Sequence, residues 1–286
     1  MIPAPFSFVR AGSVDEAVAA LREHGDEAKL LAGGHSLLPL MKLRLATPSV
    51  LVDVNDVGDQ SEIRLDGDEV VIGGLARHCE LVASDVLREH VPLLRAAAER
   101  VGDPQVRHRG TLAGSLAHGD PASDLPAAVL AVRGTITVRG PDGVRGVASD
   151  DFFLGFLETA LAQDEMITEV RVPKCTGSGW AFEKFNRRAQ DWAIVGVAAV
   201  GGARPGVALV NMASIPVRVV SVEDALRSGA RPADAAELAD AQTEPSSDLN
   251  ASAEFRRHLV RVLVRRALDD VAAREGVGTN GRTSDR

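Results

Sequence analysis

Cysteine and aromatic residues are scarce in this sequence. Its 286 residues include two cysteines, no tyrosine and 3% aromatic residues. An iron–sulfur cluster needs four thiolate ligands, and Cys79 and Cys175 are too isolated in the chain to form a metal-ligand pair. The sequence therefore predicts no cluster and no metal site, and both cysteines are interpreted as small, partly buried thiols in a reducing compartment.

Long apolar runs and basic clusters are lacking as well. No apolar run approaches the roughly 18 residues of a membrane span, and the start MIPAPFSFVR lacks the order of charged, apolar and small residues of a secretory signal. The formal net charge is −8 and the sequence pI is about 5.4, whereas nucleic-acid binding needs clustered Lys and Arg. We expect a cytoplasmic chain with no membrane span and no nucleic-acid partner.

The length and apolar content of the chain allow a substantial core. At 286 residues and 45% hydrophobic, the chain exceeds the usual size of one domain, about 100–200 residues. A Pro-, Gly- and Ser-rich break at residues 173–179 indicates the main domain boundary. We expect domains at residues 1–175 and 176–276, followed by a polar, disordered tail at 277–286.

Hydrophobic periodicity predicts helices and strands that are interleaved without a regular βαβ rhythm. This favours the α+β class over a doubly wound sheet. The first helix is expected at residues 14–22, with Ser13 as N-cap and Glu16 as its capping-box partner. Further helices are expected at 36–46, with Ser36 as candidate cap, and at 84–102, and short strands at 28–34, 51–55, 69–76, 136–140 and 167–173.

The pattern continues through the second half of the chain. Residues 110–132 are expected to pass from a glycine-broken extended stretch into a helix that opens near Ser123. Segments 193–202 and 206–214 resemble paired antiparallel strands joined by a short turn. Two helices are expected after this sheet, the last at 253–274.

A strand that runs into two glycines precedes a helix in LLAGGHSLLP (30–39). Such a turn exposes unpaired backbone N–H groups at the positive end of a helix dipole, which suits an anionic phosphate. Gly33 and Gly34 would let the chain approach the ligand closely. A glycine before a helix is more often plain turn chemistry, so both interpretations stay open at this point.

Small and polar residues gather again in TLAGSLAHGDPASDLP (111–126). Two small-residue loops, each leading into a capped helix, could clamp the two phosphates of a dinucleotide from both sides. Asp124 could accept a hydrogen bond from a ribose or ribityl hydroxyl, or it could serve with Asp120 as a turn or cap residue. Hydroxyl groups available to phosphate oxygens are those of Ser36, Thr111 and Ser115.

Other common sites do not match the sequence. Neither loop fits G-x-G-x-x-G with an acidic residue about twenty positions on, so a nicotinamide Rossmann site is disfavoured. GGARPG (201–206) lies between two strands and is interpreted as a hairpin loop. We find no pair of base and nucleophile and no metal triad. The chemical reaction is therefore expected to depend on a cofactor, and no catalytic residue is predicted.

Both loops, taken with their flanks, resemble the flavin-binding signatures of the FAD-binding medium subunits of molybdenum hydroxylases, such as aerobic carbon monoxide dehydrogenase and bacterial xanthine dehydrogenases. The matching segments are LLAGGHSLLPLMKLRLATPSVLVDVN and GTLAGSLAHGDPASDLPAAVLA. FEKFNRRAQDWAIVGVAA (182–199) is similar to the opening of the family's C-terminal domain, and SDLNASAEFRRHLVRVLVRRAL (247–268) to its closing helix. The resemblance spans nearly the whole chain.

The resemblance implies an FAD held without a covalent bond between two subdomains, at about 1–56 and 57–175, of the vanillyl-alcohol-oxidase (PCMH) type. A C-terminal antiparallel sheet with helices, of the carbon monoxide dehydrogenase flavoprotein type, would follow at 176–276. The cofactor-binding residues implied by the motifs and their immediate neighbours are Leu31, Ala32, Gly33, Gly34, His35, Ser36 and Leu37, then Thr111, Leu112, Ala113, Gly114, Ser115 and His118, and further Asp124, Ile167, Lys184 and Trp192.

Two positions depart from the family pattern. Ala113 occupies a place where relatives usually have glycine, so a methyl group accompanies the backbone there. Trp192 follows Asp191 where related chains often place a tyrosine against the flavin ring. An indole could stack on the ring and restrict access to one face, or Trp192 could be an ordinary buried tryptophan.

The function implied by the resemblance is that of an electron relay. Substrate would be oxidised at a molybdenum cofactor in a large subunit, and electrons would cross two [2Fe–2S] clusters in a small subunit to this FAD and its terminal acceptor. The family's usual assembly is a dimer of such heterotrimers. Two rivals remain: a self-sufficient flavoprotein oxidase of the same fold, and a cofactor-free structural subunit. The sequence names neither the substrate of the complex nor the acceptor.

Overall fold

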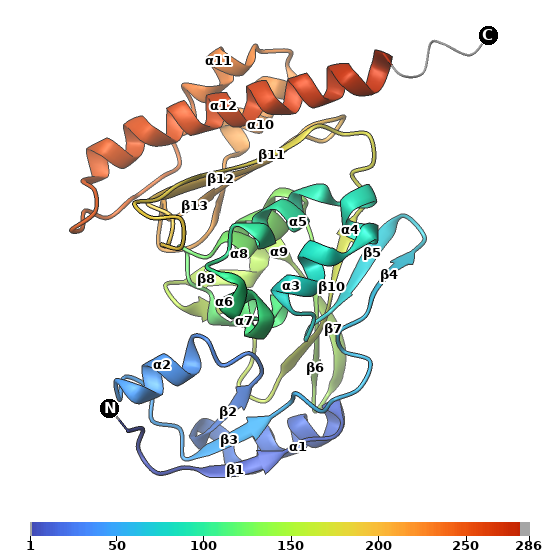
Figure 1. The fold of residues 1–286 in the computed structure, drawn as a ribbon, viewed down its shortest axis with the longest axis vertical. Helices are drawn as coiled ribbons and strands as arrows, with labels where there is room; N and C mark the ends of the chain where they lie inside the picture. Colours follow the sequence, from blue (N-terminus) through green and yellow to red (C-terminus); the bar gives the residue numbers. More distant parts are fainter. Residues whose placement is uncertain (1, 281–286) are drawn as a thin grey trace.

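A small parallel sheet forms the first lobe, for which we use residues 2–56. The computed structural model describes residues 2–280, with side chains described as far as Glu275. The strand order is β1-β3-β2, all parallel, and the apolar face of α1 packs on the sheet (Figure 1, blue). The elements are β1 (Ser7–Arg10), α1 (Val14–His24), the 3-10 turn η1 (Gly25–Glu27), β2 (Ala28–Leu31), α2 (Leu37–Lys42) and β3 (Val50–Asp53).

An antiparallel sheet with helices on one side forms the second lobe, residues 57–175. The strand order is β4-β5-β10-β6-β7. The strands are β4 (Ile63–Asp66), β5 (Glu69–Gly73), β6 (Thr135–Gly140), β7 (Gly143–Ala148) and β10 (Met166–Pro173), with the small hairpin β8 (Phe153–Gly155) and β9 (Glu158–Thr159). The helices are α3 (His78–Ala83), α4 (Asp85–His90), α5 (Pro92–Glu99), α6 (Pro104–Arg109), α7 (Leu112–His118), α8 (Asp124–Ala131) and α9 (Ser149–Phe152).

The C-terminal domain, residues 176–280, contains an antiparallel sheet of order β11-β12-β13-β14 (Figure 1). Its own helices cover one face of this sheet, and helices of the second lobe cover the other face. All six residues of β12 are buried, because alternate side chains face α12 on one side and α5 and α8 of the second lobe on the other. The elements are β11 (Trp180–Phe185), β12 (Val195–Val200), β13 (Gly206–Val210), β14 (Val217–Arg218), α10 (Val220–Arg227), α11 (Pro232–Ala236) and α12 (Ala253–Asn280).

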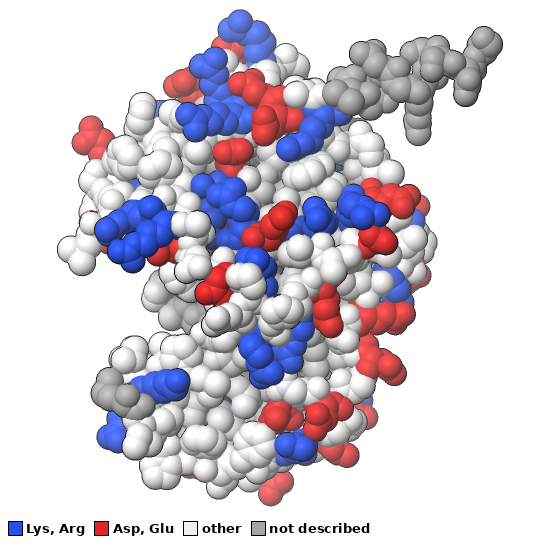
Figure 2. All heavy atoms as spheres, in the orientation of Figure 1, with Lys and Arg blue, Asp and Glu red and all other residues white. Residues whose placement is uncertain are grey.

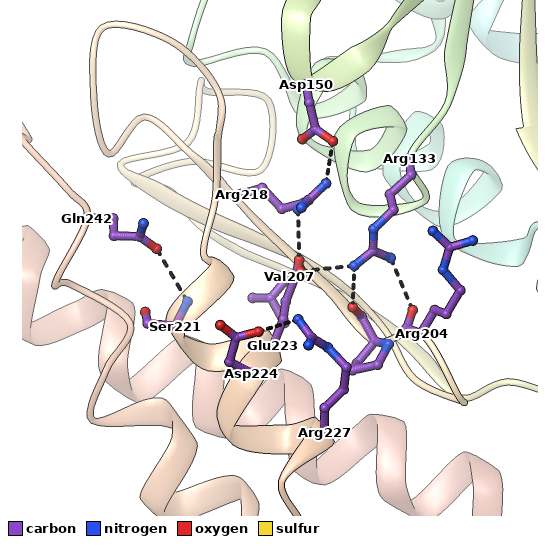
Figure 3. Close-up of polar contacts among 11 residues, drawn as sticks. Arg133, Asp150, Arg204, Val207, Arg218, Ser221, Glu223, Asp224, Arg227 and Gln242 are labelled. Atoms are coloured by element: carbon purple, nitrogen blue, oxygen red, sulfur yellow. Dashed lines mark hydrogen bonds and ion pairs between the residues drawn. The ribbon is translucent and has the colours of Figure 1, made fainter.

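A buried charge network joins the second lobe to the C-terminal domain (Figure 3). The Glu223 side chain is fully buried and pairs with Arg133 at 2.9 Å and with Arg218 at 3.2 Å. Arg218 also pairs with Asp150 of α9, and Val207 N–H donates to the Glu223 carboxylate at 3.0 Å. Groups from both parts of the chain thus share one carboxylate.

Several local expectations are confirmed. The mixed content of helices and sheets agrees with the α+β expectation, and segments 193–202 and 206–214 do pair antiparallel as β12 and β13. Ser13 caps α1, since its hydroxyl accepts from Glu16 N–H at 3.2 Å. The predicted capping box is wrong in detail, because the Glu16 carboxylate accepts from Gly12 N–H and not from Ser13 N–H.

Other expectations need correction. The helix expected at 84–102 is two helices, α4 and α5, because Pro92 has no N–H to continue α4 and begins the next helix instead. Ser36 makes no capping hydrogen bond to α2, which ends at Lys42. Three helices and not two follow the C-terminal sheet: α10, α11 and α12. Of the expected disordered tail, residues 277–280 belong to α12, and residues 281–286 lie outside the described residues.

The extended stretch expected from residue 110 is also wrong. Leu112–His118 is helix α7, because Thr111 caps it and Gly119, in the left-handed conformation, ends it. The helix expected to open near Ser123 is confirmed as α8, with Ser123 as N-cap. Within residues 2–280, none of the helices combines the length and apolar character needed to cross a lipid bilayer.

Candidate functional site

A cavity of about 910 Å³ lies between the two lobes and reaches the C-terminal domain. Its walls come from the loop after β2, the start of α7, the strand β10, and the segment that follows β11. Known ligand pockets have volumes of about 300–1,000 Å³, so the cavity is large enough for a dinucleotide-sized ligand. Figure 2 shows Lys and Arg side chains gathered near the hollow between the first lobe and the rest of the molecule, although the chain as a whole is acidic.

The loop after β2 is shaped by its two glycines. A Cβ added at Gly33 would lie 2.4 Å from the carbonyl oxygen of Arg109, and Gly34 has φ +75°. His35 Nε2 lies 3.3 Å from the carbonyl oxygen of Gln105, so the loop touches the segment before α7 at two points. Gly33 is thus needed first for the close approach of two protein backbones.

This loop presents backbone donors to the cavity. The N–H groups of Gly33, Gly34, His35 and Ser36 have no acceptor among the described residues, and all four residues line the cavity. Consecutive free N–H groups before a helix form a concave site for an anion. The phosphate interpretation of this loop is therefore supported by its hydrogen-bond inventory.

The second loop is different, because most of its backbone donors are already used. The N–H groups of Leu112 and Ala113 donate to the carbonyls of Ala76 and Gly74, both at 3.0 Å, and Gly114 N–H donates to Thr111 Oγ1 at 3.1 Å. What this side offers the cavity is mainly the Ser115 hydroxyl. The methyl group of Ala113 lies beside Gly74, where it fills space within the second lobe.

A buried ion pair between α8 and β11 lines the cavity. Lys184 Nζ of β11 lies 2.7 Å from Asp124 Oδ2 of α8 and donates to the Arg100 carbonyl at 3.0 Å. The side chains of Lys184 and Asp124 are 3% and 5% exposed. Burial raises the pKa of Asp124 to about 6, against the opposing effect of Lys184. The second oxygen, Asp124 Oδ1, is buried without a hydrogen-bond partner, which leaves an acceptor for a ligand hydroxyl.

Asp120 has a different role from Asp124. Its Oδ1 accepts from Ala122 N–H at 2.8 Å, which is a local turn contact. Asp124 stands at the first turn of α8 but points to Lys184. Asp120 is thus a turn residue, and the side chain of Asp124 is held by Lys184.

His78 is a cavity residue that sequence reasoning missed. Its ring is 4% exposed, and Nε2 lies 3.0 Å from the Thr111 carbonyl oxygen and 3.1 Å from Ser115 Oγ. Burial lowers the pKa of His78 to about 4, against the opposing effect of its hydrogen bond to the Thr111 carbonyl, and the nearby side chains of Arg77 and Arg107 add to the lowering. No local pattern around HCELVA marks this histidine, since its partners lie 33 and 37 positions away.

Most residues expected at the cofactor site line this cavity. Leu31 and Leu112 do not: Leu31 O accepts from Asn55, and Leu112 is fully buried in the core of the second lobe. Trp192 is 58% exposed, so it is not an ordinary buried tryptophan. The lining residues that were expected are Ala32, Gly33, Gly34, His35, Ser36, Leu37, Thr111, Ala113, Gly114, Ser115, His118, Asp124, Ile167, Lys184 and Trp192, and those that were missed include Leu75, His78, Leu157, Met166 and Gln190.

Comparison with known proteins gives a consistent result. A family model described as the FAD binding domain in molybdopterin dehydrogenase matches residues 4–175, and one described as the CO dehydrogenase flavoprotein C-terminal domain matches residues 180–271. The chain is 41% identical over 285 residues to the carbon monoxide dehydrogenase medium chain of Hydrogenophaga pseudoflava, covering 96% of this chain and 99% of the relative.

A medium subunit of an enzyme named for another substrate is also similar. The nicotine 6-hydroxylase medium subunit of Paenarthrobacter nicotinovorans is 36% identical over 277 residues, covering 93% of this chain and 97% of the relative. The solved structure of carbon monoxide dehydrogenase from H. pseudoflava matches with a TM-score of 0.92 and 42% identity, covering 96% of this chain and 99% of that chain. Among the side chains that the structure describes, at residues 2–275, no group of three or more His, Cys, Asp and Glu could hold a metal ion.

Proposed function

Because this chain belongs to the family of FAD-binding medium subunits of molybdenum hydroxylases, we propose that it relays electrons within such a complex. Substrate would be oxidised at the molybdenum cofactor of a large subunit. The electrons would then pass from [2Fe–2S] clusters of a small subunit through this chain to a terminal acceptor. Bound FAD would supply the redox chemistry, since it exchanges electrons singly or in pairs. A cytoplasmic location and a dimer of heterotrimers are part of this proposal.

One observation carries the cofactor assignment. Gly33–Ser36, whose N–H groups have no acceptor among the described residues, line a cavity of about 910 Å³ that Ser115 also lines. Two sets of donors suit the two phosphates of a dinucleotide, because each phosphate carries negative charge that the donors can stabilise. The residues present therefore fit FAD.

The remaining lining residues have roles that follow from their chemistry. Asp124 Oδ1, buried and unpartnered, can accept a hydrogen bond from a ribose or ribityl hydroxyl, while Lys184 balances the charge of Asp124. Exposed Trp192 at the cavity edge can stack on an aromatic ring and limit what reaches it. No residue here is assigned as catalytic.

The main alternative function is that of a self-sufficient oxidase of the same flavin fold. Such an enzyme would need a catalytic base beside the flavin. The titratable side chains with shifted pKa values in this cavity are His78 and Asp124, and both are already held by protein partners. The protein contacts of these two side chains support the relay over the oxidase.

The first test is the absorbance spectrum of the purified full-length chain, followed by acid precipitation. We expect flavin absorbance from the purified chain. We also expect FAD in the supernatant after precipitation, because the flavin is proposed to bind without a covalent bond. Colour that stays in the pellet would contradict non-covalent binding. A colourless chain that takes up no added FAD would contradict the proposed function itself.

A further inference from the structure

His78 is held against the start of α7 by backbone pairing. Arg77 and Thr111 form an antiparallel bridge, His78 N–H donates to Gly110 O and Leu112 N–H donates to Ala76 O, both at 3.0 Å. The imidazole therefore lies under α7, with Nε2 within hydrogen-bond distance of both Thr111 O and Ser115 Oγ. The other ring nitrogen, Nδ1, is buried and has no partner.

The partners of the ring determine where its proton lies. Thr111 O is a carbonyl oxygen and can only accept, so Nε2 must carry the hydrogen. A neutral imidazole has one N–H, and Nδ1 has no acceptor for a second. The lowered pKa of His78 agrees with a neutral ring at physiological pH. His78 is thus a neutral Nε2–H donor.

This donor changes what Ser115 can do. A serine inside a helix commonly donates its hydroxyl hydrogen to the carbonyl four residues earlier, which here is Thr111 O. That oxygen already receives Ser115 N–H at 3.1 Å and His78 Nε2–H at 3.0 Å, and a carbonyl has two lone pairs. Ser115 Oγ itself faces Nε2–H and can only accept from it. The hydroxyl hydrogen is left to point into the cavity, which Ser115 lines.

We propose that His78 is a positioning residue for the cofactor. It occupies the acceptor that Ser115 would otherwise use and thereby presents the Ser115 hydroxyl as a donor to an anionic oxygen of FAD. The inference rests on the proposed function, because it takes FAD as the ligand. It assigns a role to a side chain that need not touch the cofactor itself.

Two substitutions of His78 whose side-chain amides differ in length test the proposal in the full-length chain. In His78→Gln the amide N–H₂ extends about as far as Nε2, whereas in His78→Asn it stops near the position of Nδ1. The dissociation constant for FAD is measured by flavin fluorescence titration of stripped protein. We expect His78→Asn to weaken FAD binding about 10-fold, the usual effect of losing a hydrogen bond to a charged group, and His78→Gln to stay within about 3-fold of the wild type.

Ser115→Ala completes a double-mutant cycle. If His78 acts through Ser115, His78→Asn should cost about 10-fold in the wild-type background and little once Ser115 is alanine. Equal losses in both backgrounds, or equal affinities of the Gln and Asn variants, would overturn the proposal. If circular dichroism shows that His78→Asn does not fold, His78→Gln is compared with the wild type in both Ser115 backgrounds. A loss of FAD affinity above about 3-fold that persists when Ser115 is alanine then overturns the proposal.

The wild-type titration separates this inference from the proposed function. Wild-type protein that binds no FAD refutes the proposed function. Wild-type protein that binds FAD, with variants that bind it equally well, refutes only the role of His78.

Discussion

Gly33 illustrates how a single residue can serve a ligand site through the protein. The absent side chain leaves room for the carbonyl oxygen of Arg109, 2.4 Å from where a Cβ would lie, and not only for a cofactor. The loop after β2 and the segment before α7 can therefore close on each other. We expect the orientation of the free N–H groups at Gly33–Ser36 to depend on this contact.

We predict that Gly33→Ala lowers FAD affinity while most secondary structure survives. The added methyl must push the Arg109 backbone away, and such overpacking costs about 1–3 kcal/mol, or roughly 5- to 150-fold in affinity if the strain acts on the bound state. Flavin content and circular dichroism of the purified variant measure both effects. Gly58→Ala is the matched control, because a Cβ at Gly58 meets nothing within 4 Å. Normal flavin occupancy in Gly33→Ala would show that the loop contact is dispensable.

His78 and Asp124 predict opposite pH dependences of stability. The pKa of His78 falls from 6.5 to about 4 through burial, so the unfolded chain binds the proton first and stability drops as the pH falls from 6.5 toward 4. The pKa of Asp124 rises from 3.8 to about 6, also through burial, so the folded chain binds that proton first and stability drops as the pH rises from 3.8 toward 6. The two contributions oppose each other between pH 4 and 6.

Isosteric variants should separate these two contributions. We expect His78→Gln to lose less stability than wild type between pH 6.5 and 4.5, by roughly 2 kcal/mol, and Asp124→Asn to lose more. Thermal unfolding of flavin-free protein at several pH values gives the slopes. Identical slopes in His78→Gln and wild type would mean that the buried imidazole does not resist protonation.

At the level of elements, the interface between α8 and the C-terminal sheet decides where Lys184 and Trp192 lie. Both residues belong to the C-terminal domain, yet both line the cavity. The Glu223 network of Figure 3 crosses this interface, with Arg133 just after α8 and Glu223 on α10. A carboxylate that is fully buried between two guanidinium groups leaves uncompensated charge if it is removed.

We predict that Glu223→Gln destabilises the chain by about 3–5 kcal/mol, because Arg133 and Arg218 would keep their charges without the shared carboxylate. Thermal or urea unfolding measures the loss, and faster proteolysis at the 173–179 break would show that the interface has loosened. Arg227→Gln is the control on the same helix, since Arg227 forms an exposed pair with Asp224 that should contribute less than about 1 kcal/mol. Equal effects of the two substitutions would refute an interface role for Glu223.

At the scale of the whole molecule, all three parts of the chain contribute walls to one cavity. Gly33–Ser36 come from the first lobe, Thr111 and Ser115 from the second lobe, and Lys184 from the C-terminal domain. No part holds the complete set of groups.

We predict that the full-length chain alone binds FAD but oxidises no hydroxylase substrate. Because a relay subunit depends on its partners, the chain expressed with a small [2Fe–2S] subunit and a large molybdenum subunit should co-purify with iron and molybdenum and reduce a dye with substrate. Metal analysis and dye-reduction assays check this. A chain that purifies alone, without either metal, and turns over an organic substrate would establish the oxidase alternative.

Local chemistry made much of this protein predictable from its sequence. The Ser13 cap of α1, the opening of α8 at Ser123 and the pairing of β12 with β13 depend on residues a few positions apart or on simple periodicity. The helix α7 was missed, although its Thr111 cap and Gly119 stop are local signals, because the glycine within it favoured an extended interpretation. The expected cofactor residues that line the cavity were reached through whole motifs and not through any single glycine, whereas Leu31 and Leu112 were expected but do not line it and His78 was missed.

The sequence by itself determined the two glycine-containing loops, the start of α1 at Ser13 and the start of α8 at Ser123, because these depend on neighbouring residues. Only the tertiary structure decided how the donors of the site are shared: Gly33 against Arg109, Asp124 with Lys184 across 60 positions, and His78 under Thr111 and Ser115. The physical reason is that burial and hydrogen-bond saturation depend on which distant groups pack together. The free N–H groups at Gly33–Ser36 and the used ones at Leu112 and Ala113 could be told apart only once their acceptors were in place.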